Sequence, residues 1–526
     1  MVRVLRLLLS FLIIAHVLSA AAEEPAGDNK PVWFTPEQIQ ADFDYLYDGL
    51  QSANFDLYAF TGQDEFETRF QSLRRSFNQP MTRFDAEMSF QQFVALADQS
   101  HTRIESDFSG FFAHIASGGL VFPLDIAVEN GQMLVTGNAS SVQDIQPGDR
   151  ITAIGEEKVT DLLPRLTAHL SAESPEFALV LLETYMPLVV WLENGRSDVS
   201  SVTVEHADGT RGVYDLGADP GVDRAVDVDE NQASVETNQP YSLQGRDAKM
   251  LTETVAYLRP GPFSNTDLGA NPLDTKKYLT FIDSAFEEFV DNKAAHLILD
   301  LRNNPGGNNS FSDPVIAWFA DRPFRFSSDF RVRVSPLTTA ANQARLATLP
   351  ESSSNVSRLY AELFASSEDG QIVQFSIPEV KPRPEPRFAG EVTVLVNRYS
   401  FSNAVTAAAL IQDYGFGTIM GEPTVDMATT YGAMERFTLP ITGIVVTYPK
   451  ALIVRPNGMD HAHPLTPDIA LPSRRVRGVI DVMLQTATEH IQSNAEQSAV
   501  PGKESGKDSR KNNRKDNRKD RLLPST

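Results

Sequence analysis

The sequence predicts an α/β protein whose carboxyl-terminal half is built on a mostly parallel sheet, preceded by a helical region and a β-rich region. Three observations predict this. Residues 35–100 repeat apolar residues at helical spacing, residues 119–216 contain short strands joined by turn sequences, and strands alternate with helices from residue 250 onward. With 526 residues, 41% of them hydrophobic, the chain is long enough for two or three domains with buried cores.

The first 22 residues predict a signal peptide. Arg3 and Arg6 precede the apolar run LLLSFLIIAHVL, and the small residues SAAA follow before Glu23. The run is shorter than the roughly 20 residues of a membrane span, and we expect cleavage after Ala20 or Ala22. The alternative is an uncleaved anchor. Because a signal peptide directs export and no later membrane span is expected, we expect the protein in the periplasm or outside the cell. The sequence has no cysteine, so disulfides are excluded.

The charge of the chain argues against nucleic acid as a partner. The formal net charge is −23, although the last 26 residues carry nine Lys and Arg against four Asp and Glu. An acidic body repels a phosphate backbone. Residues 486–526 are expected to finish a helix and then form a disordered basic tail, because residues 501–526 contain almost no apolar side chains.

The amino-terminal half divides into two predicted domains and a linker. Residues 23–118 are predicted to form a helical domain, in which TPEQIQADFDYLYDGL begins near a capping box at Thr35 and MTRFDAEMSFQQFVALADQ forms another helix. Residues 119–216 are predicted to form a β-rich domain, with hairpins at Asn-Gly and Asp-Gly turns. Its phrase IQPGDRITAIGEEKVTDLLPRL resembles the PDZ domain, and the alternative is an unrelated β-hairpin. Residues 217–249 are acidic and are predicted to be a linker.

Residues 250–485 are predicted to form the α/β domain. The strand sequences TVAYLR, AHLILDLR, GEVTVLV and GTIMGEP alternate with helical sequences, which is typical of a parallel sheet with crossover helices. Ligands of such sheets bind beyond the carboxyl ends of the strands. The phrases NNPGG and Ser400–Ser402 both stand at such ends.

Two of these phrases together resemble a known family. LILDLRNNPGG, followed about ninety residues later by VLVNRYSFSNAVTAAALIQDYG and IMGEPT, resembles the tail-specific, or carboxyl-terminal-processing, serine proteases, whose relatives include the tricorn core protease and a retinoid-binding protein. The resemblance is strong over residues 251–425. It implies a catalytic domain of the crotonase/ClpP-like fold beside the helical and PDZ-like domains.

The resemblance implies that Ser402 is the nucleophile. A hydroxyl at a strand–helix turn is exposed at the sheet edge, where amides at the helix start can hold an oxyanion. By resemblance, the oxyanion donors are the amides of Asn403 and of Gly306 or Gly307, and glycine lets a substrate approach closely. The alternative is that Ser402 only caps a helix and the glycine pair only makes a turn.

A serine nucleophile needs a base. Well-known family members use a lysine, but Met427 stands at that position and cannot accept a proton; Tyr431 also departs from the pattern, and Lys450 is a conceivable substitute. The tricorn-like branch uses a histidine from the amino-terminal region, and ADQSHTRIE resembles that motif. The resemblance therefore implies His101 as base, with Ser100 in support. The alternative is a structural histidine.

The third catalytic member should be a carboxylate. The tricorn-like pattern places it before a Pro-Asp phrase, and in NGMDHAHPLTPDIAL the nearest carboxylate is Asp460, which could also be an exposed loop acid. Asp460, His461 and His463 could instead bind a metal, but no third partner at a recognisable spacing and no HExxH motif occur. Neither a metal nor another cofactor is therefore expected.

The sequence thus predicts an exported serine peptidase that cleaves polypeptides through an acyl-enzyme, with Ser402, His101 and Asp460 as its catalytic residues. By resemblance, it could process the carboxyl ends of its substrates, and a PDZ-like pocket would suit that role. The alternatives are an inactive ligand- or peptide-binding member of the same fold and an esterase acting on small acyl groups. The sequence predicts no oligomeric state.

Overall fold

The computed structural model describes residues 32–105, 108–198, 201–216, 246–267, 271–348, 355–471 and 481–499. The predicted signal peptide, residues 217–245 of the predicted linker and the basic tail from residue 501 lie outside the described residues. Contacts divide the chain into two compact units, and the second begins at Val482 with helix α13 (Val482–Ala499). The first unit is not divided further, so the predicted domain borders within it stay predictions.

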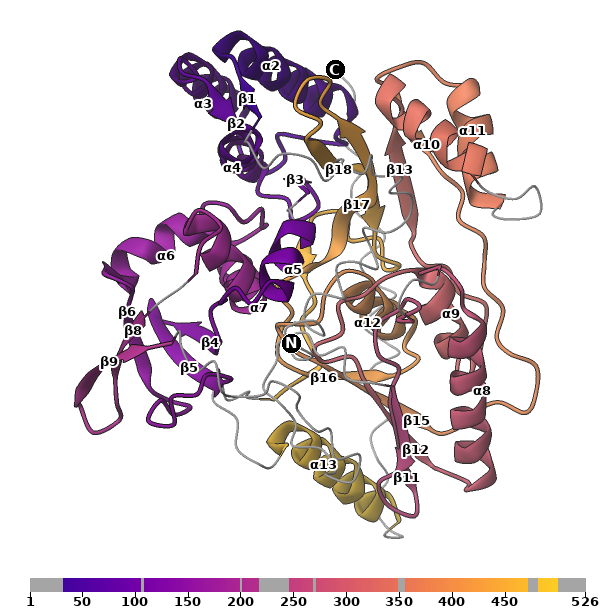
Figure 1. The fold of residues 1–526 in the computed structure, drawn as a ribbon. Helices are drawn as coiled ribbons and strands as arrows, with labels where there is room; N and C mark the ends of the chain where they lie inside the picture. Colours follow the sequence, from indigo (N-terminus) through magenta and orange to yellow (C-terminus); the bar gives the residue numbers. More distant parts are fainter. Residues whose placement is uncertain are drawn as a thin grey trace, which may run out of the picture. The chain divides into compact units, whose positions relative to one another are not determined.

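A six-stranded sheet carries the carboxyl-terminal half of the first unit (Figure 1). Its strands, in spatial order, are β10 (Asp247–Met250), β11 (Val255–Arg259), β12 (His296–Asp300), β15 (Glu391–Val396), β16 (Thr418–Gly421) and β20 (Ile469–Ala470). All neighbours are parallel except β10 and β11. The mixed α/β fold expected from the alternating pattern is confirmed. The linker prediction was wrong for residues 247–249, because they pair with β11 as an edge strand.

Three helices connect these parallel strands: α8 (Lys276–Asp291), α9 (Asn309–Ala317) and α12 (Asn403–Tyr414). Their apolar faces share one core with the strands, in which Ile282, Leu299 and Ala408 are fully or almost fully buried. Strand β12 is buried along nearly its whole length, as expected of a central parallel strand covered on both faces. This packing fixes the strand ends at which the candidate site lies.

A second sheet lies in the same half of the chain and was not expected from the sequence. Its order is β14 (Ile372–Gln374), β13 (Asp329–Arg333), β18 (Val445–Val454), β17 (Met427–Thr438) and β19 (His463–Pro464), and the short strand β3 (Arg103–Ile104) also pairs with β18. In that pairing Ile104 lies opposite Val446. Strand β3 therefore fixes a segment from the beginning of the chain to the carboxyl-terminal half.

Helices dominate the described residues between 32 and 116. They are α2 (Pro36–Ala53), α3 (Gln63–Ser76), α4 (Arg83–Val94), the 3₁₀ turn η1 (Ala95–Ala97) and α5 (Phe108–Ala116), with a small pairing of β1 (Trp33–Phe34) and β2 (Met81–Thr82). The predicted capping box at Thr35 is present: its side chain accepts from the Gln38 amide, and the Gln38 side chain accepts from the Thr35 amide. The aromatic core of these helices includes Phe437 and Tyr448 of β17 and β18.

Residues 124–215 form an antiparallel sheet, as the turn sequences indicate. Its strands are β4 (Leu124–Glu129), β5 (Gln132–Asn138), β6 (Arg150–Ile154), β8 (Ser201–Glu205) and β9 (Arg211–Asp215), with β7 (Glu157–Lys158) beside β6. Asn130 and Gly131 both have positive φ at the β4–β5 turn, which is the geometry that favours Asn-Gly in hairpins. Helices α6 (Val159–Thr167) and α7 (Pro175–Glu193) pack on this sheet.

Helix α7 has the length and apolar composition of a membrane-crossing helix, contrary to the expectation that no segment after the signal peptide has them. About two thirds of its apolar window is buried inside the protein, where Phe177, Leu182 and Met186 have no exposed surface. Its apolar composition therefore follows from its place in the core. The remaining helices of the first unit are α10 (Pro336–Thr348) and α11 (Asn355–Ala365), which follow β13.

Candidate active site

Ser402 lies in a strained turn between β15 and α12. Its φ of 52° and ψ of −124° fall in a region that residues with a side chain seldom adopt. It is the N-cap residue of α12, but its hydroxyl makes no capping hydrogen bond. The side chain is partly exposed, whereas Phe401 and Asn403 on either side of it are buried. The helix-capping alternative therefore does not explain this serine.

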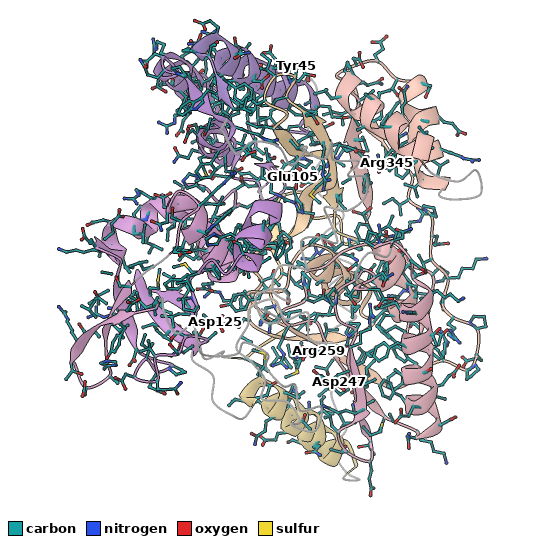
Figure 2. The ribbon with its side chains drawn as sticks, in the orientation of Figure 1. Tyr45, Glu105, Asp125, Asp247, Arg259 and Arg345 are labelled. Carbon is teal, nitrogen blue, oxygen red and sulfur yellow. The ribbon has the colours of Figure 1, made fainter. Side chains whose placement is uncertain are left out.

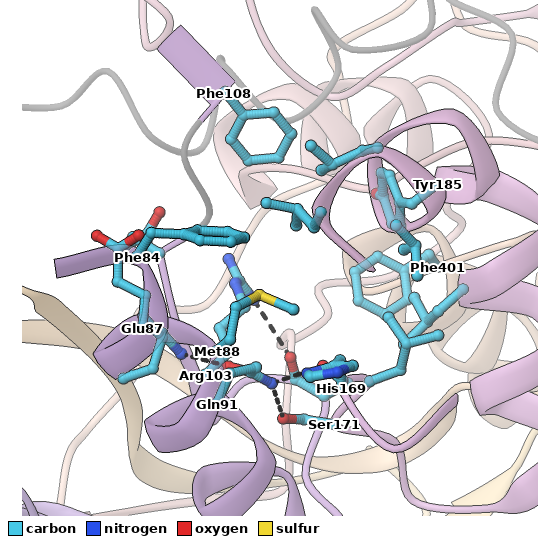
Figure 3. A pocket seen from close by; sticks show the side chains of 18 residues that line it. Phe84, Glu87, Met88, Gln91, Arg103, Phe108, His169, Ser171, Tyr185 and Phe401 are labelled. Atoms are coloured by element: carbon cyan, nitrogen blue, oxygen red, sulfur yellow. Dashed lines mark hydrogen bonds between the residues drawn. The ribbon is translucent and has the colours of Figure 1, made fainter. Parts of the chain in front are cut away.

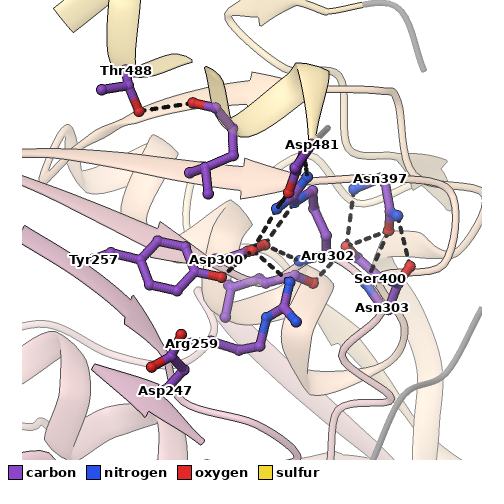
Figure 4. Close-up of polar contacts among 12 residues, drawn as sticks. Asp247, Tyr257, Arg259, Asp300, Arg302, Asn303, Asn397, Ser400, Asp481 and Thr488 are labelled. Atoms are coloured by element: carbon purple, nitrogen blue, oxygen red, sulfur yellow. Dashed lines mark hydrogen bonds and ion pairs between the residues drawn. The ribbon is translucent and has the colours of Figure 1, made fainter. Parts of the chain in front are cut away.

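The neighbouring serine has a structural task. Ser400 is buried and donates its hydroxyl to the carbonyl oxygen of Leu301 at 2.8 Å, while it accepts from the Asn397 amide at 3.1 Å. Asn397 also exchanges hydrogen bonds with Asn303, which follows the neighbouring strand β12 (Figure 4). These contacts tie the two strand ends together, so Ser400 holds the turn that presents Ser402.

The glycine pair lies directly against this turn. A Cβ atom on Gly306 would lie 2.5 Å from the carbonyl oxygen of Phe401, 2.7 Å from the amide nitrogen of Asn403 and 2.8 Å from Cβ of Ser402. The Gly306 amide already donates to the side chain of Asn304 at 2.9 Å. Within the described ranges, the amides of Gly307 and Asn403 donate to no protein group. These two amides are therefore the available donors near Ser402.

A buried ionic network holds the segment before the glycine pair. Asp300 accepts from the backbone amide and guanidinium of Arg302, from Arg259 at 2.9 Å and from the hydroxyl of Tyr257 at 2.8 Å (Figure 4). Arg302 reaches on to Asp481 with two further bonds. Burial alone would raise the pKa of Asp300, but the two arginines hold it well below its usual value. Figure 2 marks Arg259 at the end of β11. The network fixes the ends of β11 and β12.

Strand β3 brings His101 to the candidate site. The imidazole is 5% exposed and stacks on the ring of Phe401, the residue before Ser402, with ring centroids 5.8 Å apart and planes inclined by 22°. Burial lowers the pKa of His101 to about 4, and Arg103 contributes, while a hydrogen bond with the backbone of Tyr431 opposes the shift. The ring is therefore neutral near pH 7 and has a lone pair available.

Ser100 links His101 to a carboxyl group that no sequence pattern indicates. Its amide and hydroxyl donate to Oε1 of Glu173, at 3.1 and 3.0 Å, and its hydroxyl oxygen lies 3.5 Å from Nδ1 of His101. Oε2 of Glu173 is buried without a hydrogen-bond partner. Glu173 precedes helix α7, more than seventy residues from the histidine. Nothing in the phrase SAESPEF distinguishes it from a surface acid.

A second buried carboxyl group contacts the nucleophile turn. Asp426 has 1% of its surface exposed and accepts hydrogen bonds from the backbone amides of Ser402 and Met427. Burial raises the pKa of Asp426. Burial and the nearby charge of Asp426 also raise the pKa of Glu173. The two acids are thus close enough to repel one another, and this repulsion favours protonation of one of them.

Asp426 could have been found from the sequence. It stands beside Met427, the residue that occupies the family's lysine position, and a carboxyl group there is an obvious candidate once the lysine is missing. Met427 itself is buried at the start of β17. Lys450 is buried in an ion pair with Glu435 and lies over the ring of Tyr360, so the structure gives it no contact with Ser402 or His101.

The structure does not bring Asp460 into this group. Asp460 is exposed in the loop between β18 and β19, and within the described ranges no hydrogen bond or ion pair joins it to Ser402, Ser100 or His101. His461 and His463 lie nearby with ring centroids 6.1 Å apart. Among the described residues, no group of three or more His, Asp or Glu side chains is arranged to hold a metal.

The arrangement therefore combines most of the predicted residues with two additional acids. Ser402, Asn403, Gly306 and Gly307 converge at one turn, and His101 lies beside that turn with Ser100 behind it. No hydrogen bond within the described ranges joins the Ser402 hydroxyl to His101. Chemically, the turn offers a hydroxyl, two free amide donors and a neutral imidazole close by. These are the nucleophile, oxyanion donors and base that acyl transfer requires.

Comparison with solved structures supports the fold. Mature CPAF superposes with a TM-score of 0.56 at 16% identity, covering 87% of this chain and 96% of that chain. Mature CPAF complexed with lactacystin gives 0.57 at 15% identity, covering 88% and 98%. At these identities the likeness shows the fold alone. A comparison with curated proteins gives no significant match.

The sequence of the sheet region matches one family model. The model of peptidase family S41 matches residues 255–471, which include the glycine pair, Ser402 and Asp426. Over these residues the chain is similar to peptidase family S41, a family of serine peptidases, as the resemblance implied. The family match begins at residue 255 and does not include the predicted helical and PDZ-like regions on the amino-terminal side of it. Those two interpretations therefore stay predictions.

Proposed function

We propose that this protein hydrolyses peptide bonds through an acyl-enzyme formed on Ser402. One observation carries the proposal: a strained serine, with no capping bond, lies against the glycine pair and beside a residue, Phe401, on which the buried His101 stacks. A positive φ at such a turn stores strain that a purely structural serine would not need. The match to family S41 supports the same reaction class.

In the proposed reaction, the Ser402 hydroxyl attacks the peptide carbonyl while His101 takes its proton. The carbonyl oxygen becomes an oxyanion that accepts hydrogen bonds from the amides of Gly307 and Asn403. When the carbon–nitrogen bond breaks, the protonated imidazole gives the proton to the leaving amine. Water then attacks the ester, with His101 again as base, and the new carboxyl end leaves as Ser402 regains its proton.

Two further residues position this machinery. Ser100 lies beside Nδ1 of His101 and is itself held by Glu173, so we assign Glu173 the orienting task that the sequence suggested for Asp460. Asp426 holds the backbone of Ser402 by accepting a hydrogen bond from its amide. Neither acid needs to touch the substrate, and each acts through a neighbour.

The step between Ser402 and His101 needs a hydrogen bond that is not formed between these two residues in the described part of the chain. Catalytic hydrogen bonds are often long before substrate binds and shorten in the complex. The imidazole stacks on Phe401, which is adjacent to Ser402 in the chain. A modest movement of a side chain or loop would therefore bring the imidazole to the Ser402 hydroxyl. Substrate binding is proposed to complete the contact.

We also propose that the protein is exported and that its β-rich region is a PDZ-like module. The order of charged, apolar and small residues at the beginning of the sequence supports export, and the absence of cysteine is compatible with it. The antiparallel sheet β4–β9 with helices α6 and α7 supports the second proposal. Such a module could present polypeptide carboxyl ends to Ser402.

Digestion of an unfolded protein tests the proposed function. Purified wild-type protein should cleave casein, and the Ser402→Ala variant should not, while both show the same circular dichroism spectrum. A parallel assay with nitrophenyl esters separates a peptidase from an esterase, because an esterase would hydrolyse the esters and leave casein intact. Absence of both activities, with ligand binding retained, would favour the carrier alternative.

A further inference from the structure

An open, mostly apolar pocket with a cavity volume of about 120 Å³ adjoins the proposed catalytic residues (Figure 3). Its walls come from three separate parts of the chain. Helix α4 and the segment around β3 supply Phe84, Met88, Ser100 and Ile104; the segment before α7 and α7 itself supply Leu170, Leu181, Tyr185 and Leu188; and the nucleophile turn supplies Phe401. In Figure 3, Phe84 and Phe108 face Tyr185 and Phe401 across the opening.

The cavity shares a wall with the proposed active site. Phe401 precedes Ser402 and stacks on His101, and Ser100 lies against the Nδ1 side of the same imidazole. Both Phe401 and Ser100 line the cavity. A group that fills the cavity therefore contacts residues that adjoin the proposed base, His101, and the proposed nucleophile, Ser402.

Most of the surface that lines the cavity is apolar, although several polar residues contribute to it. Gln91 donates its side-chain amide to the carbonyl oxygen of His169 and to Ser171, and it accepts from the Ile104 amide. Arg103 donates to the carbonyl oxygen of Ser100. Glu87 and Glu105 also line the cavity and pair with Arg83 and Arg436, whereas Nδ1 of the lining residue His169 is buried without a hydrogen-bond partner. Because most of these polar groups are bonded within the protein, an entering charged group would lose its hydration without equivalent compensation.

The size of the cavity excludes a large ligand. An apolar cavity of about 150 Å³ accommodates one benzene molecule, whereas pockets for drug-sized ligands measure roughly 300–1,000 Å³. A volume of about 120 Å³ thus fits one branched or aromatic side chain but not a retinoid-sized molecule. This argues against the carrier alternative for this cavity.

We propose that this cavity is a specificity pocket that takes one apolar side chain, of leucine to phenylalanine size, from a residue flanking the scissile bond of a polypeptide substrate. The inference rests on the proposed peptidase function and names its substrate class. A side chain anchored here would fix the neighbouring peptide carbonyl in front of Ser402, which is how binding energy is converted into orientation.

The test combines cleavage-site profiling with variants that change the volume of the cavity. Full-length protein is incubated with an unfolded protein mixture, and the cleaved bonds are identified by mass spectrometry. The wild type should show at least tenfold enrichment of Leu, Phe and Met over Asp and Lys at one position flanking the cut. Leu170→Trp, which fills the cavity from its half-buried rim, should reduce that ratio at least tenfold in favour of Ala and Ser.

A second variant works in the opposite direction, and a third serves as the control. Met88→Ala enlarges the cavity and should shift the preference towards Phe and Trp. Leu163→Trp makes the same substitution in a partly buried leucine that packs against the same core but does not line the cavity. It should leave the profile unchanged. Thermal melting of each variant confirms that it is folded.

The possible outcomes separate this inference from the proposed function. A profile without apolar preference, or one that Leu170→Trp and Met88→Ala leave unchanged while casein is cleaved, would overturn the pocket and leave the peptidase intact. No cleavage and no labelling of Ser402 by a fluorophosphonate would overturn both. A profile that Leu163→Trp alters as strongly as Leu170→Trp would also overturn the pocket.

Discussion

The imidazole of His101 stacks on the ring of Phe401, although three hundred residues separate them in the chain. The pairing of β3 with β18 fixes His101 on one side, and the end of β15 fixes Phe401 on the other. If His101 is the base, its replacement should remove activity without unfolding the protein. We expect His101→Ala to lower kcat/KM by about 10²–10⁴-fold, since that is what general-base catalysis contributes. Steady-state peptide hydrolysis with matched melting curves measures this effect.

The turn at Ser402 should be more stable with glycine. Because the φ of 52° is unfavourable for a residue with a Cβ atom, Ser402→Gly should be more stable than Ser402→Ala by on the order of 1–3 kcal/mol. Both variants lack the hydroxyl and should be inactive. Chemical denaturation of the two proteins gives the difference directly, and equal stabilities would contradict a strained turn.

The close approach of Gly306 to the nucleophile turn predicts a large effect of a single methyl group. Gly306→Ala should reduce kcat/KM at least 10²-fold, because the new Cβ would collide with the Phe401 carbonyl and the Asn403 amide. Gly370→Ala is the matched control: its φ of +82° is nearly the same as the +81° of Gly306, but its Cβ would meet open space. That variant should cost about 1–2 kcal/mol of stability and leave activity intact.

Protonation of His101 should destabilise the folded protein. Burial lowers the pKa of His101 to about 4, below its ordinary value of 6.5, so the unfolded chain takes up the proton first. The corresponding stability is present above pH 6.5 and is lost as the pH falls towards 4, by on the order of 3 kcal/mol. Unfolding measured from pH 7 to 4 should show a steeper loss in wild type than in His101→Phe, and parallel curves would contradict the shift.

The two buried acids should act in the opposite direction. Burial raises the pKa values of Glu173 and Asp426, so the folded protein holds more protons than the unfolded chain. The stability gained in this way is present below the ordinary carboxyl pKa and is lost as the pH rises through the raised values. Glu173→Gln should therefore flatten the loss of stability on the alkaline side. It should also alter the pH profile of kcat/KM, an effect that a merely structural residue would not have.

A buried ion pair connects the nucleophile turn to helix α7. Arg398 bonds Glu183 at 3.0 Å, and Glu183 also accepts from the amide of Val128 and the hydroxyl of Tyr399. Arg398→Leu would remove this ion pair from a buried carboxylate and should cost about 3–5 kcal/mol. Lys277→Met, which removes one partner of the exposed pair with Asp267, should leave the melting temperature unchanged.

Much of the α/β region could be predicted from its sequence, because apolar periodicity and turn residues are local signals. The strands that end at Asp300 and Val396 follow from their apolar runs, and Ser402 and the glycine pair follow from the phrases at those ends. The long hairpin of β17 and β18 was missed, since its residues MATTYGAMERFT mix polar and apolar types without strict alternation.

The remaining part of the site depends on contacts between distant segments. Glu173 becomes significant only because the chain before α7 folds against Ser100, and no spacing within the sequence encodes that contact. Asp460 stands before a Pro-Asp phrase, as the family pattern requires, yet its loop leaves it exposed and without a bond to Ser402 or His101 in the described chain. Whether a carboxyl group belongs to a site depends on its three-dimensional position, which the order of residues in the sequence does not provide.

Labelling by a fluorophosphonate probe tests the central claim most directly. The probe forms a covalent bond with an activated serine, and mass spectrometry of the digested protein identifies the modified residue. We predict a single adduct on Ser402 in the wild type, no adduct in Ser402→Ala, and a labelling rate at least 100-fold lower in His101→Ala. An adduct on a different serine, or a rate that His101→Ala leaves unchanged, would contradict the proposal that these two residues form the catalytic pair.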